Sequence, residues 1–169
     1  IGGVSTVETA VDGLSTAMNT YGQENLSAKD AADAMFTAVK LGKTNFEQLS
    51  TTMSTVLPVA KAMGVDFDQV MAAVATLTKQ GVPTAQAMTQ IRSAMQALGS
   101  PTTRQSEYLQ QLGVDTEKMK QALAGPNGLA VAMQMMEKAA AGDNEKLRKM
   151  VGSVEALQGI LGVTARGGF

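Results

Sequence analysis

The stretch "AMGVDFDQVMAAVATLTKQGVPTAQA", residues 62–87, contains two helix ends, two helix beginnings and an apolar stripe between them. Gly64 and Gly81 each follow a helical stretch, and glycine readily adopts the left-handed backbone conformation that ends a helix. Asp66 stands before the next helix with Gln69 three residues later, which is the spacing of a reciprocal capping box. The stretch contains no histidine, cysteine or evident nucleophile. It therefore predicts helix boundaries without predicting chemistry.

The same signals of helix beginnings and ends recur along the whole chain. Ser27 with Asp30, and Thr44 with Glu47, repeat the spacing of a capping box. Further small polar residues that stand where a helix is expected to begin are Asp115, Asn127, Asp143 and Ser153. Glycines that follow a helical stretch, and are expected to end it, are Gly42, Gly64, Gly81, Gly99, Gly113, Gly125, Gly142 and Gly152.

Between these signals the apolar residues recur at steps of three and four, the period of one face of a helix. Three such faces are Phe67, Val70, Met71, Val74 and Leu77; Phe46, Leu49, Met53, Val56, Ala60 and Met63; and Met88, Ile91, Met95 and Leu98. No comparable run alternates with a period of two, so no sheet is expected. The sequence predicts an all-α fold, a compact domain of about nine or ten short helices joined by short glycine-capped loops. Helices so short are marginal alone and must pack on one another.

We expect residues 1–169 to form a single helical domain that is a fragment of a longer chain, with residues 27–162 as its core. The first helix carries apolar residues at alternating steps of three and four, the spacing of a coiled coil. They are Val4, Val7, Val11, Leu14, Met18 and Tyr21. An ordinary amphipathic helix is the preferred interpretation. The alternative is that residues 1–21 end an upstream coiled coil and self-associate through residues 4–21.

Pro58, in "STVLPVAKAMG", interrupts another apolar stripe. Proline lacks the amide donor and crowds the preceding turn, so the helix is expected to kink or divide near Leu57. A static kink that wraps the core is the preferred interpretation, and a hinge at Pro58 is the alternative.

The segment "LAVAMQMMEKAAAG", residues 129–142, is apolar around most of the helix circumference. The residues responsible are Leu129, Val131, Met133, Met135 and Met136. Such a helix is either buried on all sides or offers a surface to a partner. Burial is the preferred interpretation, and a partner-contact surface is the alternative. The segment is too short to cross a membrane.

Composition excludes several classes of function. The 14 Lys and Arg residues nearly cancel the 15 Asp and Glu residues, and the net charge of -1 gives no long-range field to attract nucleic acid. The chain has no Cys and no His, which excludes thiolate nucleophiles, His-based zinc sites and Ser-His-Asp triads within it. We expect no enzymatic activity, catalytic residue, metal or cofactor, and no nucleic-acid specificity. Asp66 is interpreted as a cap, and Asp30 with Asp33 as the solvated first turn of a helix.

A family resemblance rests on the central phrases "AVKLGKTNFEQL", "VLPVAKAMGV", "AAVATLTKQGVPTAQA" and "QIRSAMQAL". The later phrases "LGVDTEKM", "GLAVAMQMM" and "VGSVEALQGILGVT" follow in the same order. Each phrase alone is a generic capped helix, but their order and spacing together are specific. In these phrases the chain resembles the core region of tail tape measure proteins from tailed bacteriophages and prophages.

The resemblance implies a structural and assembly role. Proteins of this family are long, mainly helical chains around which tail tube subunits polymerise, and their length sets the length of the tail. The resemblance thus implies a location in the tail lumen of the virion, and in the host cell cytoplasm during assembly. The implied partners are tail tube, tail-tip and tail-assembly chaperone proteins, and ejection ahead of the DNA is implied. No catalytic residue transfers from the family.

Three alternatives to this role stay open at the level of sequence. The first is a membrane-active or envelope-penetrating module for DNA delivery, in which residues 129–142 become exposed and insert. The second is an enzyme that uses only carboxylates or hydroxyls. The third is a docking module for a tail-tip or chaperone protein.

Overall fold

The computed structural model describes residues 2–165, with side chains from Val7 onward, so Val4 in the predicted stripe lies outside the described side chains. These residues form eleven α-helices and one short 3-10 helix, with no strand, which confirms the predicted all-α class. The helices are α1 (Gly2–Tyr21), α2 (Ala28–Leu41), α3 (Phe46–Thr52), η1 (Met53–Thr55), α4 (Leu57–Ala62), α5 (Phe67–Lys79), α6 (Thr84–Gly99), α7 (Thr103–Gln111), α8 (Thr116–Leu123), α9 (Gly128–Ala140), α10 (Asn144–Val151) and α11 (Val154–Thr164).

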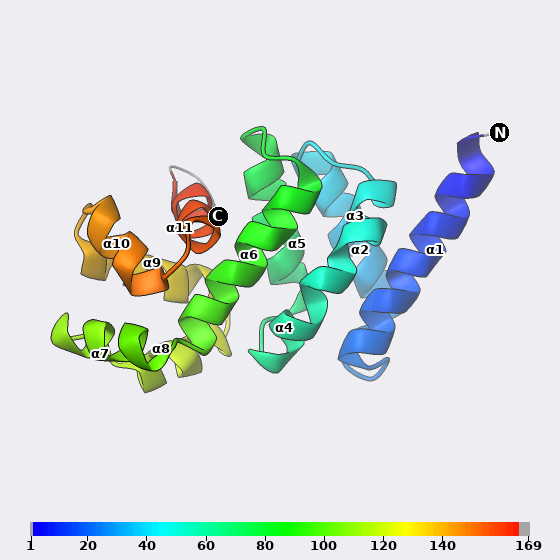
Figure 1. Ribbon diagram of the computed structural model, residues 1–169. Helices are drawn as coiled ribbons and strands as arrows, with labels where there is room; N and C mark the ends of the chain where they lie inside the picture. Colours follow the sequence, from blue (N-terminus) through cyan, green and yellow to red (C-terminus); the bar gives the residue numbers. More distant parts are fainter. Residues whose placement is uncertain (1, 166–169) are drawn as a thin grey trace.

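Helices α5 and α6 form the centre of the structure. Each buries nine residues, and the stripe predicted from Phe67 to Leu77 is no more than 2% exposed at any of its five positions. Figure 1 shows α6 between two groups of helices, with α1 to α5 on one side and α7 to α11 on the other. The buried residues form one contiguous core.

Methionine is prominent in this core. Nine of the chain's 12 methionines are buried. Methionine is unbranched and flexible, so its side chain fills irregular gaps between helices that cross at many angles. Flexible methionine side chains thus form a substantial part of the contacts between the short helices.

Local capping follows the sequence at many helix ends. The side chains of Ser27, Asp115, Asp143 and Ser153 each accept a hydrogen bond from a backbone amide of the helix they precede, as predicted. The predicted helix-ending glycines with a left-handed backbone are Gly64, Gly81, Gly113, Gly142 and Gly152. The prediction for Thr44 was wrong: Asn45 caps α3, and the Thr44 hydroxyl lies 2.8 Å from the Thr84 hydroxyl on α6. Thr44 thus makes a tertiary contact with Thr84 in place of a local cap.

The capping box predicted from Asp66 and Gln69 is also absent. The Asp66 side chain makes no cap hydrogen bond, and the carboxylate of Asp68 accepts from the Gln69 amide instead. The Gln69 side chain is buried, and its Oε1 accepts a hydrogen bond of 3.0 Å from the backbone amide of Leu129. That amide lies in the first turn of α9, where backbone donors have no partner within the helix. Because Asn127 does not cap α9, Gln69 supplies the cap from another helix.

Pro58 lies in the first turn of α4, where its missing amide donor is not required. The stripe from Phe46 onward is divided here, because α3 and η1 end before Val56 and α4 begins at Leu57. The division agrees with the sequence. The hinge at Pro58 stays a prediction.

Helices α6 and α11 cross closely at Gly159. A Cβ atom at this position would lie 2.7 Å from the carbonyl oxygen of Gln90, which is backbone and cannot rotate away. At Gly162 on the same helix, a Cβ atom would meet the tip of the Leu77 side chain, which can change rotamer. The absence of a side chain at Gly159 therefore sets the distance between the two helices.

We expect Gln69→Leu to lower the free energy of unfolding by about 1–3 kcal/mol, because the buried Leu129 amide would lose its acceptor. Urea denaturation followed by circular dichroism measures the change. Gln86→Leu, at an exposed position of α6, is the control and should have little effect. Equal stability of the two variants would contradict the assigned role of Gln69.

The second prediction compares two alanine substitutions in α11. Gly159→Ala should destabilise the chain by about 1–3 kcal/mol, because the new methyl group forces the backbones of α6 and α11 apart. Gly162→Ala should cost less, because the side chain of Leu77 can change rotamer whereas the Gln90 backbone cannot. The gain in helix propensity from glycine to alanine, about 1 kcal/mol, is the same at both positions. Thermal or urea denaturation of both variants measures the two losses of stability. A larger loss for Gly162→Ala would show that the α6–α11 crossing is described wrongly.

Candidate interaction surfaces

Among residues 2–165, no group of three or more Asp, Glu, Cys or His side chains is placed to hold a metal ion. The buried hydroxyl of Tyr21 donates a hydrogen bond of 2.7 Å to the carbonyl oxygen of Val65. Burial raises the pKa of Tyr21 far above its ordinary value, and the negative charges of Asp66 and Asp68 add to the shift. Tyr21 therefore stays protonated and anchors the end of α1 to the start of α5.

The five residues predicted as a contact surface on α9 do not share one face. Leu129, Met133 and Met136 are fully buried, as the preferred interpretation expected, because their spacing places them on the side of α9 that packs against α8, α6 and α11. Val131 is 40% exposed and Met135 is partly buried. Three of the five side chains are therefore covered in this conformation, and a partner-contact surface on α9 stays a prediction. No helix within residues 2–165 is long and apolar enough to cross a bilayer.

The stripe predicted on α1 turns away from the core at its N-terminal end. Val7 is 64% exposed and Val11 is 53% exposed, whereas Gly13, Ala17 and Tyr21 form the buried line. Gly13 lies against Ser50 of α3, where a side chain would not fit, so small residues bring α1 close to α3. Figure 1 shows the first turns of α1 extending beyond the other helices. Self-association through residues 4–21 stays a prediction, and the two exposed valines are the described residues that would serve it.

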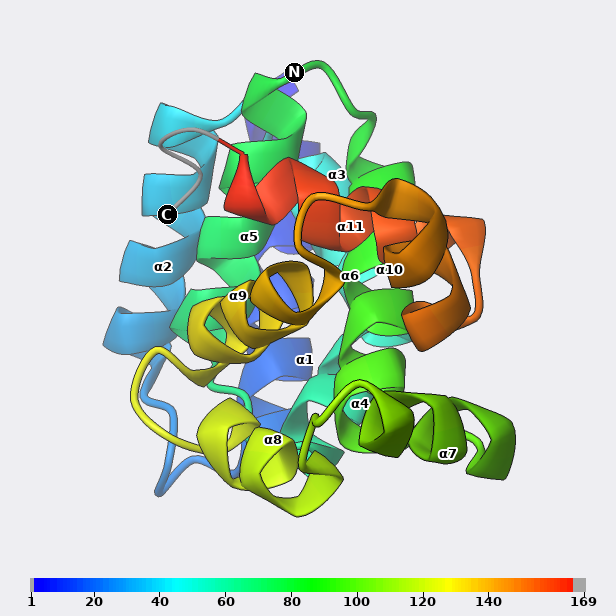
Figure 2. The ribbon, with the colours of Figure 1, turned by 90° about the vertical axis from the view of Figure 1, so that its left-hand side faces the viewer.

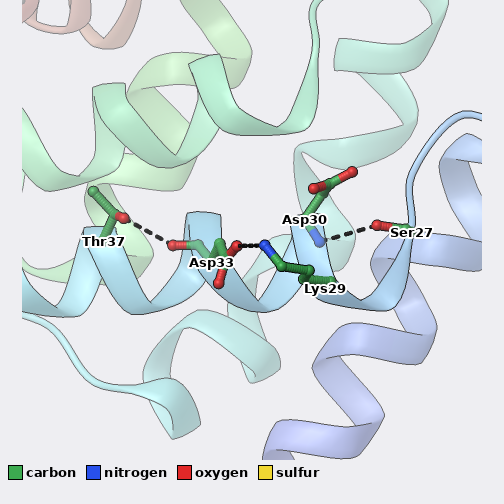
Figure 3. Close-up of polar contacts among 5 residues, drawn as sticks. All are labelled: Ser27, Lys29, Asp30, Asp33 and Thr37. Carbon is green, nitrogen blue, oxygen red and sulfur yellow. Dashed lines mark hydrogen bonds and ion pairs between the residues drawn. The ribbon is translucent and has the colours of Figure 1, made fainter.

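A groove between α2 and α5 was not predicted from the sequence. It has a volume of about 1010 Å³ and lies along the two helices, which run side by side in Figure 2. Asp30, Asp33, Asp66 and Asp68 line one part of it. Figure 3 shows polar contacts along α2, where the Asp30 amide donates to the Ser27 hydroxyl and Lys29 pairs with Asp33 at 2.7 Å.

The four aspartates of the groove come from two helix beginnings that are far apart in the sequence. The sequence predicts a cap for Asp66 and a solvated first turn for Asp30 with Asp33, and it predicts no role for Asp68. The only sequence signal that relates the helices is a shared spacing, because Asp30, Ala34 and Leu41 repeat the spacing of Asp68, Ala72 and Lys79. Nothing in the sequence indicates that these two sets of residues, one on α2 and one on α5, face the same groove.

The described residues thus define an all-helical protein whose prominent surface features are a groove and an exposed helix end. The family described as phage-related minor tail protein matches residues 1–159, and the chain belongs to this family. The chain is also similar to the tape measure protein of Pneumococcus phage Dp-1, with 25% identity over 108 residues. The matched region is 64% of this chain and 9% of that relative, so the chain spans only a small part of the relative's length. No solved structure matches the chain.

These matches confirm the resemblance that the central phrases indicated. As a member of this family, the chain is a structural component of a phage tail and of the virion.

The burial of α9 generates a prediction about membranes. Because Leu129, Met133 and Met136 already lie in the core, we expect the folded chain to release no dye from lipid vesicles at neutral pH. Fluorescence dequenching measures release, with detergent defining the full signal. Release that Val131→Glu abolishes would contradict the prediction and favour the membrane-active alternative, since Val131 is the exposed apolar residue of α9.

Proposed function

We propose that this chain is a segment of a tape measure protein that occupies the tail lumen of a phage. The observation that carries the proposal is the family match over residues 1–159, together with the likeness of 108 residues to a protein named as a tape measure protein. Because that likeness covers 9% of the relative, we propose further that the segment is one domain of a much longer chain.

In this proposal the segment works through contacts and its own dimensions, not through catalysis. The whole protein sets tail length, templates assembly of the tube and leaves ahead of the DNA. Its partners are tail tube, tail-tip and tail-assembly chaperone proteins, and chaperones hold it in the host cytoplasm before the tube closes. The organisation of the fold supports such a role, because six of the eleven described α-helices have a side-chain cap of their own and the helices are joined by a methionine-rich core.

The dimensions of the segment set limits on how much of the tail's length it can account for. If the helices were opened end to end, 169 residues at 1.5 Å each would span about 250 Å. As a compact body, the same residues have a radius of gyration near 15 Å and a diameter of about 40 Å. The two states therefore differ roughly sixfold in length.

We expect in-frame deletion of residues 1–169 from the parent gene to give phage with shorter tails. Negative-stain electron microscopy measures tail length, and duplication of the segment should lengthen tails by the same amount. A change near 250 Å would mean that the helices are opened in the tail, and one near 40 Å that they remain packed. Unchanged tail length in both the deletion and the duplication would overturn the assignment as part of a length-setting chain.

A further inference from the structure

The groove between α2 and α5 has a defined direction, because the two helices run parallel. Tyr21, the last residue of α1, stands before the loop that leads into α2 and contacts the beginning of α5 through Phe67 and Val65. At the other end, the Lys43 amide donates to the Thr78 hydroxyl near the end of α5. Both helix beginnings therefore lie at one end of the groove and both helix ends lie at the other.

Two matched rows of side chains form the walls. On α2 the row is Asp30, Ala34, Thr37 and Leu41; on α5 it is Asp68, Ala72, Ala75 and Lys79. Both rows follow steps of four, three and four, so each forms one line along its helix. The middle of each row is small, which leaves space between the helices. Each row spans 12 residues, and the 11 rises between its ends correspond to about 16 Å, or three turns of a helix.

The floor of the groove is apolar and firmly held. Phe67, Met71 and Ala38 line it and are at most 2% exposed, so they form part of the core. Leu41 also lines the groove and is 59% exposed, although it is a large apolar side chain. An occupant that covers this surface would gain about 25 cal/mol for each Å² of apolar area removed from water.

The ends of the groove carry opposite charges. Asp30, Asp66 and Asp68 are exposed at one end, and within residues 2–165 no Lys or Arg forms an ion pair with any of them. Asp33 is the exception at this end, because Lys29 pairs with it. Lys79 lines the opposite end, is exposed, and likewise has no ion-pair partner among the described residues. An occupant must therefore be basic where it meets the aspartates and acidic where it meets Lys79.

We infer that the groove binds an amphipathic helix of another tail protein, antiparallel to α2 and α5, with acidic residues in its first turn and basic residues in its last. This distribution suits any isolated helix, because it complements the helix dipole. In the antiparallel orientation the basic last turn meets Asp30, Asp66 and Asp68, and the acidic first turn meets Lys79. The exposed part of α1 from a second copy fits less well, because its charges there, Glu8 and Asp12, are both acidic.

The inference rests on the proposed role as a tail component that acts through contacts, but its test is separate. The probe is a fluorescent helical peptide of about 12 residues, with leucines on one face, glutamates in its first turn and arginines in its last. A second peptide has glutamates in place of the arginines. Fluorescence anisotropy against the whole chain measures the affinity of both.

We expect the first peptide to bind about tenfold more tightly than the second, because several exposed ion pairs each contribute modestly. Asp30→Lys should remove this preference. Glu155→Lys is the matched control, because Glu155 is also an exposed first-turn acid but lies in α11, outside the groove. Ala72→Trp, at an exposed position of α5, should abolish binding of both peptides by filling the groove. Circular dichroism checks that each variant is folded.

A nitroxide label at the C-terminus of the first peptide tests its orientation. It should broaden the amide signals of residues 28–33 more than those of residues 77–80. The reverse pattern would overturn the antiparallel arrangement. Absence of binding by either peptide, or equal affinities, would overturn the groove as a charge-selective docking site.

One other occupant would be recognised by its own result. Dimers of the chain that Asp30→Lys dissociates, seen by sedimentation, would replace the proposed partner with a second copy. Tail length in the deletion phage depends on none of these results, so the two proposals fail separately.

Discussion

Burial of apolar faces between helices is the interaction on which the whole structure depends. Helices α3, α4, α8 and α10 have only six to eight residues. Isolated helices below roughly 12–15 residues are marginal in water, so these four are held by their contacts with the core. Helices α5 and α6 supply the largest share of that core, and the other helices pack around them. Capping residues and terminal glycines determine where each helix begins and ends, but packing against the core is what makes the helix stable.

The parts of the fold that depend on local chemistry could be predicted from the sequence. The stripe from Phe67 to Leu77 is buried as its spacing predicts, because a helix with one apolar face has one way to cover it. Ser27, Asp115, Asp143 and Ser153 cap their helices because each bond closes within a few residues. The class of fold follows from such signals repeated along the chain.

The features of the fold that depend on which helices pack together could not be predicted from the sequence. Gln69 has the spacing of a local cap, yet it caps α9 across 60 residues. Val7 and Val11 continue an apolar stripe, yet they are exposed because Gly13 and Ala17 give α1 a closer contact with α3. The groove depends on α2 and α5 lying parallel, and each of its aspartates has a sufficient local explanation without the others. Contacts between helices therefore account both for the predicted caps that do not form and for the groove that could not be predicted from the sequence.

In the proposed role, the chain acts through the shape that it holds and the surfaces that it offers. That shape is held by one contiguous core. Its surface offers an exposed helix end on α1 and a groove that is acidic at one end and basic at the other. These two features lie on different helices and can serve different contacts.

The most direct test of this account compares loss of helicity with loss of packing. Far-ultraviolet circular dichroism reports the helices, and the near-ultraviolet signal of buried Tyr21 and partly buried Tyr108 reports the packing around them. If burial holds the short helices, both signals should change together in a single urea transition. Helicity that persists after the tyrosine signal is lost would contradict the account, because the helices would then be stable without the core.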